Sequence, residues 1–349
     1  MKKFIKSQID SFDKKKYKKS DLLKSNIIED FPMLYRIQIK NNKMIYDTEI
    51  IKNVFIDIKE GVDRKERLIN ILQKMLDKYK VKDTVLILSY VDGYFWKKDI
   101  PVFNYSVPIG KKGLIFPNFD ILDFKDDGIV YDFDGIKDKI ENRPVKKIKN
   151  DIFFRGGLTS KNRSKIREKI QYEKIPFNVR LIKGGLNDIY NRFLFLLKIA
   201  INATDLVESK FINSFKKHKY LLDLPGVKPW SVRLKYLFVM NSVVFRISFY
   251  NSKNGEKGYF QQSYDYLFKE NKDYIHLIYD FNYDEEIPKN IYIKCVNDIK
   301  EKYTYYENNE NQYKKMVTNM QKASKKLDLD EMLKYLHTLI ETYTEKLLV

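Results

Sequence analysis

Apolar positions recur along the chain with two different spacings, and each spacing predicts a different element. Residues 33–47 alternate between apolar and polar around Asn41-Asn42, which predicts a β-hairpin. Residues 63–79 repeat apolar positions every three or four residues, which predicts a helix with one buried face. The first part of the chain therefore mixes strands and helices.

A buried strand is expected next. Residues 85–90 are apolar except for Ser89 and are followed by Val91, Asp92 and Gly93. Asp92 thus stands at the carboxyl end of a strand, where open α/β sheets place ligands and catalytic groups. Shorter strands are expected at 101–105 and within 114–124.

The stretch 215–246 predicts a strand, a turn, a helix and a second strand. A run at 220–224, apolar except for Asp223, is broken by Pro225 and Gly226. Ser231 is placed to cap a helix before the strand at 243–247. A helix N-terminus beside strand ends offers N–H groups and a positive dipole end to a phosphate. Arg233 and Lys235 add two full charges in the first turns.

A second unit of this kind is expected upstream. The strand 151–154 leads into a turn, Arg155-Gly156-Gly157, where glycines let the backbone approach a ligand closely. Thr159 suits the cap of the following helix, and Arg163 adds a guanidinium. Two such units suit a diphosphate ligand such as a nucleotide-sugar. The alternative, ordinary α/β turns with solvated arginines, stays open.

The remaining pattern predicts strands at 178–182 and 274–279, a polar helical region at 301–326 and an amphipathic helix at 329–348. A polar stretch at 124–150 marks a change of domain. We expect a first domain at 1–145, a second at 146–325, and a last helix at 326–349 that packs back on the first domain.

Composition sets broad limits on function. The chain has 349 residues, and 66 Lys+Arg against 47 Asp+Glu give a net charge of +19, which suggests nucleic acid, an anionic membrane or a phosphorylated ligand. The lysines are spread along the whole chain, and the abundance of Lys, Asn, Ile, Tyr and Phe is typical of an AT-rich genome. Cys295 is the single cysteine, which excludes an intramolecular disulfide and a cysteine zinc cluster.

The N-terminal residues carry no secretory signal, and no stretch reaches the length of a membrane span. A cytoplasmic protein is therefore expected, of a cell or of a virus-infected host cell. The sequence does not indicate the oligomeric state.

The motifs in this order resemble the CAP10/Rumi/POGLUT-type glycosyltransferases, glycosyltransferase family 90. The resemblance covers roughly 84–279 and is densest at Phe153-Phe154-Arg155-Gly156-Gly157-Leu158-Thr159 and from His218 to Leu237, with its Ser231-Val232-Arg233-Leu234-Lys235 core. A later piece, Tyr264-Asp265-Tyr266-Leu267 followed by Tyr274-Ile275-His276-Leu277, matches an aromatic segment of the family.

The resemblance implies an α/β fold of the GT-B type, with two Rossmann-like domains facing across a cleft and the second one holding a UDP-sugar. It also implies an inverting reaction without a metal or other cofactor, and transfer of glucose or xylose to a hydroxyl of a glycan or protein. No nucleic acid partner is expected on this reading.

The resemblance also assigns roles to residues. In the family, an acidic residue after a strand and shortly before a Pro-Val-Phe strand is the catalytic base, and here that residue is Asp92. Donor contacts are expected from one set of residues, namely Arg155, Gly156, Gly157, Thr159, Arg163, Gly226, Ser231, Arg233, Lys235 and His276. Without a metal, arginines and helix N-termini must meet the charge of the leaving diphosphate.

Departures from the family keep alternatives open. Gly157 replaces a hydroxyl residue of the first motif, and Pro225 replaces the usual Asp of the second. One alternative is a degenerate glycosyltransferase that binds UDP without transfer. Another is a basic, non-catalytic polyanion-binding protein. Asp132 and Asp134 superficially resemble a metal-binding carboxylate pair, but two aspartates in a turn are the simpler interpretation.

Overall fold

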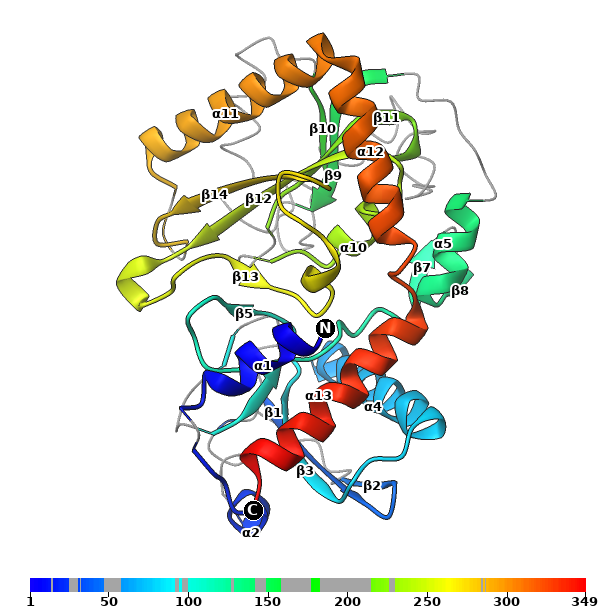
Figure 1. Ribbon diagram of the computed structural model, residues 1–349, viewed down its shortest axis with the longest axis vertical. Coiled ribbons are helices and arrows are strands. Elements are labelled where there is room, and N and C mark those ends of the chain that lie inside the picture. Colours follow the sequence, from blue (N-terminus) through cyan, green and yellow to red (C-terminus); the bar gives the residue numbers. More distant parts are fainter. Residues whose placement is uncertain are drawn as a thin grey trace. The chain divides into compact units, whose positions relative to one another are not determined.

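The computed structural model describes residues 1–13, 15–24, 31, 33–46, 58–91, 94–95, 100–126, 129–141, 149–157, 177–182, 215–225, 230–283, 285 and 287–349, with the backbone alone for 58–63, 125–126, 149, 155–157 and 177–182. These residues form two compact units, each described here by itself (Figure 1). Unit 1 comprises Met1–Asp123, Tyr250–Leu267 and Lys326–Val349, and unit 2 comprises Phe124–Phe249 and Phe268–Lys325.

Unit 1 contains a five-stranded sheet in the order β2-β1-β3-β4-β6. Its strands are β1 (Leu34–Lys40), β2 (Lys43–Tyr46), β3 (Thr84–Ser89), β4 (Val102–Asn104) and β6 (Leu114–Ile115). β1 pairs antiparallel with β2 and β3, whereas β3, β4 and β6 are parallel. Asn41 and Asn42 join β1 to β2 with φ of 50° and 60°, the left-handed conformation that a two-residue hairpin turn requires. The predicted hairpin is therefore confirmed.

Helices pack on the sheet of unit 1. They are α1 (Lys2–Asp10), α2 (Lys19–Lys24), α4 (Ile58–Lys78) and α13 (Leu329–Leu347). α13 begins at Asp328, whose carboxylate accepts a hydrogen bond from the Glu331 N–H at 2.7 Å. Tyr343 of α13 donates to the Val85 carbonyl oxygen at 2.8 Å, which ties the helix to β3. A short pair, β5 (Val107–Pro108) and β13 (Phe260–Gln261), completes this unit with 3₁₀ turns at Ser252–Asn254 and Asp265–Leu267.

Unit 2 contains a five-stranded sheet in the order β10-β9-β11-β12-β14. Its strands are β9 (Lys149–Gly157), β10 (Phe177–Ile182), β11 (His218–Asp223), β12 (Val243–Tyr250) and β14 (Ile275–Asp280). β9 pairs parallel with β10 and with β11, and β11 pairs parallel with β12. The other elements are β7 (Phe124–Asp126), β8 (Ile129–Tyr131), α5 (Phe133–Glu141), α10 (Leu234–Leu237), α11 (Lys289–Asn308) and α12 (Glu310–Ser324).

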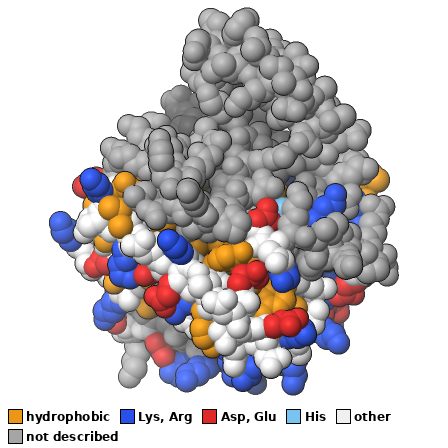
Figure 2. All heavy atoms as spheres, turned by 90° about the horizontal axis from the view of Figure 1, so that it is seen from above, with side chains coloured by type: hydrophobic (Ala, Val, Ile, Leu, Met, Phe, Trp, Pro, Cys, Tyr) orange, Lys and Arg blue, Asp and Glu red, His pale blue; other side chains and the backbone are white. Residues whose placement is uncertain are grey.

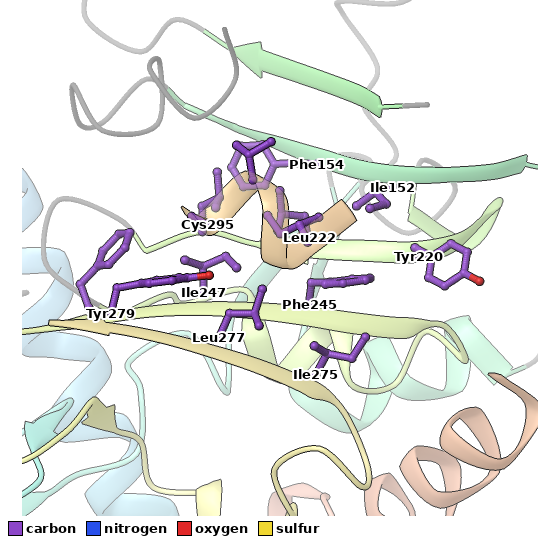
Figure 3. Close-up of a cluster of buried hydrophobic side chains, with 14 of the residues drawn as sticks. Ile152, Phe154, Tyr220, Leu222, Phe245, Ile247, Ile275, Leu277, Tyr279 and Cys295 are labelled. Atoms are coloured by element: carbon purple, nitrogen blue, oxygen red, sulfur yellow. The ribbon is translucent and has the colours of Figure 1, made fainter. Parts of the chain in front are cut away.

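One cluster of buried hydrophobic side chains in unit 2 lies on one face of this sheet. Figure 3 shows alternate residues of neighbouring strands, among them Phe154, Leu222, Phe245 and Leu277, gathered where Cys295 of α11 meets the sheet. The period of two arises because successive side chains of a strand point to opposite faces of the sheet. Burial raises the pKa of the Cys295 thiol to about 12, so the thiol stays protonated and packs as an apolar group.

The predicted α/β class is confirmed, because each unit combines helices with a sheet that contains parallel strands. Residues 124–141, which the sequence assigns to the first domain, cluster with unit 2, and residues 250–267 cluster with unit 1. The domain boundaries expected from the sequence, at 145/146 and 325/326, stay a prediction. Among the described residues, no helix has both the length and the hydropathy needed to cross a membrane.

Charged side chains of both signs share the surface. Figure 2 shows one face, on which the described Lys and Arg side chains lie among Asp and Glu side chains and a few hydrophobic ones. On this face, the described part of the chain therefore does not gather its positive charge into a single basic patch.

Candidate functional site at the sheet edge of unit 2

The sheet of unit 2 has a point at which its strand order reverses. The chain passes from β9 to β10 on one side, and later strands are added on the other side, beginning with β11. Open α/β sheets bind ligands at such a switch point, just beyond the carboxyl ends of the strands. Here Gly156 and Gly157 end β9, while Asp223 ends β11 and Leu224 follows it. These four residues therefore mark the edge of the sheet that is suited to a ligand.

The glycine motif of β9 differs from the prediction. The sequence predicts a turn at Arg155-Gly156-Gly157. In the structure the backbone of these residues continues β9 and pairs with residues 180–182 of β10, so the prediction of a turn is wrong. The parallel pairing with β10 continues through Gly157, whereas, among the described residues, the pairing with β11 reaches only Phe153. The two glycines still bring side-chain-free backbone to the end of the strand.

Three polar side chains meet at the end of β11. Asp223 is only 2% exposed, and its Oδ1 accepts a hydrogen bond from the Ser231 hydroxyl at 2.6 Å. The Arg233 Nη2 lies 3.7 Å from the same Oδ1 and donates to the Leu224 carbonyl oxygen at 3.2 Å. The Arg233 guanidinium also lies 4.7 Å from the centre of the Phe154 ring. These contacts hold a serine and an arginine of the predicted motif together at the sheet edge.

Burial and the nearby Asp223 carboxylate have opposite effects on the pKa of Arg233. Its side chain is 16% exposed, and burial lowers the pKa of the guanidinium, whereas the nearby Asp223 carboxylate raises it. An arginine titrates so high that it stays charged even after such a shift. Arg233 therefore contributes a mostly buried positive charge beside the carboxyl ends of the strands.

The predicted helix after Gly226 is shorter than expected. α10 comprises only Leu234–Leu237. Its N-cap residue is Arg233, and no side chain of the described residues caps it by a hydrogen bond. The prediction that Ser231 caps this helix is wrong, because its hydroxyl donates to Asp223 instead. A single turn aligns few peptide dipoles, so side-chain charge rather than a helix dipole dominates here.

Lys235 and His276 are both buried. The Lys235 ammonium donates to the Val232 carbonyl oxygen at 3.0 Å and lies 4.4 Å from the Tyr236 ring centre. His276 Nε2 lies 2.8 Å from the Ser248 hydroxyl, and its Nδ1 lies 3.5 Å from Glu270 Oε2. Their predicted contacts with a donor stay predictions.

Sequence reasoning missed Arg246. It is buried on β12 as the register partner of Asp223, and its Nη1 donates to the Tyr274 hydroxyl at 3.5 Å. The signal was available, because Arg246 and Ser248 alternate with the core residues Phe245 and Ile247. An arginine and a serine at alternate positions of a buried strand indicate buried polar groups on the face opposite Phe245 and Ile247.

In unit 1, hydrogen bonds hold Tyr90, which precedes Asp92 in the chain, and Phe95, which follows it. Asp92 itself lies outside the described residues. The Tyr90 N–H donates to the Met33 carbonyl oxygen at 3.3 Å, and Asn104 of β4 holds Phe95. The Asn104 amide accepts from the Phe95 N–H at 2.8 Å and donates to the Phe95 carbonyl oxygen at 3.2 Å. Asn104 is thus a second residue that sequence reasoning did not single out.

Three predicted donor residues, Thr159, Arg163 and Gly226, also lie outside the described residues. The Asp132 carboxylate accepts a hydrogen bond from the Gly135 N–H at 2.8 Å at the start of α5, and Asp134 lies in the first turn of that helix, so the two aspartates begin a helix and do not lie in a turn as expected. Within the described part of the chain, no group of three or more His, Cys, Asp or Glu residues is arranged to hold a metal ion.

An α/β chain with a glycine-ended strand and a buried arginine at the switch point fits a class of proteins that bind nucleotides at this edge. Comparison with known families identifies the class further. Residues 13–253 match Glycosyl transferase family 90, which is more than half of the chain. The chain therefore belongs to glycosyl transferase family 90, and the expected glycosyltransferase class is confirmed. His276 lies beyond the matched residues.

Solved structures show more distant similarity. The C-terminal domain of a glycosyl transferase group 1 family protein (LpcC) from Francisella tularensis has 10% identity and a TM-score of 0.30, covering 59% of this chain and 94% of that one. The GtfA/B complex has 9% identity and a TM-score of 0.38, with 67% and 41% covered. The pneumococcal O-GlcNAc transferase GtfA, in complex with UDP and GlcNAc, has 10% identity and a TM-score of 0.35, with 87% and 51% covered.

At these TM-scores the similarities carry no argument about this chain, which spans about half or less of the last two proteins. No curated protein matches the sequence.

We expect Asp223→Asn to lower the free energy of unfolding by about 3–5 kcal/mol, because it removes one partner of a buried charge pair. Urea denaturation measures the change. Asp280→Asn, at the exposed end of β14, is the matched control and should stay within about 0.5 kcal/mol of wild type. A loss below about 1 kcal/mol in Asp223→Asn would show that the Asp223 charge does not balance Arg233.

Proposed function

We propose that this chain transfers a sugar, glucose or xylose, from a UDP-sugar to a hydroxyl of a glycan or protein, with inversion and without a metal. The observation that carries the proposal is the match to Glycosyl transferase family 90 over residues 13–253. It supports the reaction class directly, and the donor, the stereochemistry and the residues below are parts of the proposal.

Asp92 is the proposed general base. Its carboxylate takes the proton of the acceptor hydroxyl while the hydroxyl oxygen attacks the anomeric carbon of the sugar. The new carbon–oxygen bond forms on the side opposite UDP, and the bond to the diphosphate oxygen breaks with its electron pair going to UDP. The product therefore has the inverted configuration, and the proton stays on Asp92 until it passes to solvent.

The leaving diphosphate gains negative charge, and cationic side chains stabilise that charge in the transition state. We assign this role to Arg155, Arg163 and Arg233, because a guanidinium can donate two parallel hydrogen bonds to phosphate oxygens. Support for Arg233 comes from its place at the end of β11, beside the strand-order reversal. Support for the glycines comes from the end of β9, where backbone without side chains leaves room for a phosphate.

A screen of donors tests the proposal. Thermal shift and hydrolysis are measured with UDP-glucose, UDP-xylose, UDP-galactose, UDP-N-acetylglucosamine and GDP-mannose, with and without EDTA. We expect UDP to stabilise the protein and one UDP-sugar to be cleaved equally well in EDTA.

Short duplex DNA is the control for the polyanion-binding alternative, which the net charge of +19 favours. A response to DNA alone, lost at high salt, would contradict the proposal. Binding of UDP without cleavage of any donor would leave two possibilities, a missing acceptor or a degenerate active site.

Arg233→Ala should weaken UDP binding by about 1.5–3 kcal/mol, the range for hydrogen bonds to charged groups. Isothermal titration measures the affinity, and a melting curve shows that the variant is folded. Lys219→Ala, on the same strand but paired with Glu307, is the matched control and should bind UDP like wild type. Wild-type affinity in folded Arg233→Ala would mean that Arg233 does not contact the diphosphate.

Asp92→Asn should reduce transfer by a factor on the order of 10²–10⁴, the contribution of a general base, because an amide cannot take the proton. UDP affinity should stay within a few-fold of wild type. Asp77→Asn, on the exposed side of α4, serves as the control. If Asp92→Asn turned over at the wild-type rate, another residue would have to be the base.

A further inference from the structure

A pocket of about 570 Å³ lies in unit 2 and is lined by described residues from three parts of that unit. Glu141 ends α5, Val239 and Asn241 lie in the connection between α10 and β12, and Lys322 and Lys325 come from the last turn and the C-cap of α12. The two lysines and Glu141 are exposed, so solvent reaches the pocket. Its volume is within the range of small-molecule sites.

The pocket belongs to the edge of the sheet opposite the one where Asp223 lies. Val239 and Asn241 shortly precede β12 and therefore stand at its amino end. The end of α5 is held at the same edge, because the ammonium of Lys216, two residues before β11, donates to the Ile140 carbonyl oxygen. Since β11 and β12 are parallel, their amino ends lie together. The pocket is therefore separate from the candidate site at the carboxyl ends of the strands.

Several polar side chains of the pocket are available to a ligand. Those that have no hydrogen-bond or ion-pair partner among the described residues are Glu141, Asn241, Gln321, Lys322 and Lys325. Thr318 and Ser324 also line the pocket, and their hydroxyls donate to carbonyl oxygens of α12 at 2.9 Å and 3.1 Å. Their oxygens can still accept hydrogen bonds.

The charges of the lining narrow the choice of ligand. Lys322 and Lys325 are three residues apart in helical backbone, so their ammonium groups lie on one face of α12. Two ammonium groups repel a metal cation, and the Glu141 carboxylate repels a bare anion such as sulfate, which has no hydroxyl to donate to it. No aromatic side chain is among the described residues that line the pocket, so a nucleobase has no ring to stack on.

A sugar with one acidic group matches every part of this lining. Its anionic group can accept charge-assisted hydrogen bonds from Lys322 and Lys325, and its hydroxyls can donate to the Glu141 carboxylate. The amides of Asn241 and Gln321 can both donate to and accept from such hydroxyls. We propose that this pocket binds an anionic saccharide, a sugar that carries one carboxylate or one phosphate. The proposal does not depend on the proposed transfer.

Isothermal titration of the full chain tests the ligand class at constant ionic strength. The probes are methyl glucuronide, glucose 6-phosphate, methyl glucoside, sulfate and an acidic peptide. At least one of the two acidic sugars should bind at least about tenfold more tightly than methyl glucoside, and comparison of the two distinguishes a carboxylate from a phosphate. Equal binding of methyl glucoside, binding of the peptide or sulfate alone, or no binding of either acidic sugar up to about 10 mM would overturn the proposal.

Charge variants test the residues. Lys322→Gln/Lys325→Gln should bind the acidic sugar at least about tenfold more weakly, because both charge-assisted hydrogen bonds are lost. Lys315→Gln, exposed on α12 but outside the pocket, is the matched control and should bind like wild type. Melting curves show that the variants are folded. Wild-type affinity in the folded double variant would overturn the proposal.

Glu141→Ala separates a saccharide from a simple anion. Loss of the carboxylate should weaken binding of the acidic sugar by about fivefold, because its hydroxyls lose an acceptor, while any binding of sulfate should become tighter. Tighter binding of the acidic sugar in this variant would overturn the saccharide assignment, because Glu141 would then only repel the ligand.

Asn241→Gly tests the pocket without changing its charge. Asn241 has a φ of 56°, a left-handed conformation that glycine adopts without steric cost, so the variant loses the amide and keeps the backbone. Its melting temperature should stay within about 3 °C of wild type, and its affinity for the acidic sugar should fall by about fivefold. Wild-type affinity in this variant would contradict the assigned contact with the amide.

The last measurement separates the pocket from the donor site. Because the two lie at opposite edges of the sheet, the acidic sugar should bind with the same affinity in the presence of saturating UDP. Displacement by UDP would overturn the proposal, since the sugar would then occupy the donor site. If UDP itself does not bind, the proposed transfer is wrong, and the titrations of wild type and variants still decide the pocket.

Discussion

The carboxylate of Asp223 is a buried charge at the end of a buried strand, and much of the edge of unit 2 is arranged around it. A charge removed from water must be hydrogen-bonded and balanced. Ser231 supplies the hydrogen bond, Arg233 supplies a nearby positive charge, and Arg246 stands opposite on the next strand. The chain between β11 and α10 is thereby held close to the strand ends. A requirement of stability thus places cationic groups where an anionic ligand would bind.

The same requirement explains which parts of the structure could be predicted. Some elements have an apolar spacing that fits only one kind of secondary structure, such as the hairpin at Asn41-Asn42 and the helix α13. Their predicted bounds are close to the observed ones. Their register and faces follow from burial alone. Ser231 and Gly157 were misplaced because their local preferences, a helix cap and a turn, compete with partners distant in sequence. For Ser231 the competing partner is a buried carboxylate, and for Gly157 it is a neighbouring strand.

The candidate site was predictable to a similar extent. The motif arginine Arg233 could be named from sequence, but its partners Asp223 and Leu224 depend on the turn after β11. Asn104 and Asn118 are both asparagines that follow apolar residues, and their sequence neighbourhoods do not distinguish them. One amide is satisfied by the backbone of Phe95, and the other has no partner among the described residues. That difference exists only in three dimensions, since it depends on which backbone groups reach each side chain.

The two units differ in the polar groups that they bury, because among the described side chains named here only unit 2 buries arginines. The edge of unit 2 carries full charges, those of Asp223, Arg233 and Arg246. Unit 1 buries the neutral side chains of Ser89, Asn118 and Gln262 together with the carboxylate of Asp120. Charged groups that are already desolvated discriminate strongly in favour of a charged ligand, and buried neutral groups discriminate against one. Under the proposed function, the buried charges beside the carboxyl ends of β9 and β11 would serve the diphosphate of the donor, because the cost of removing them from water is already met by the fold.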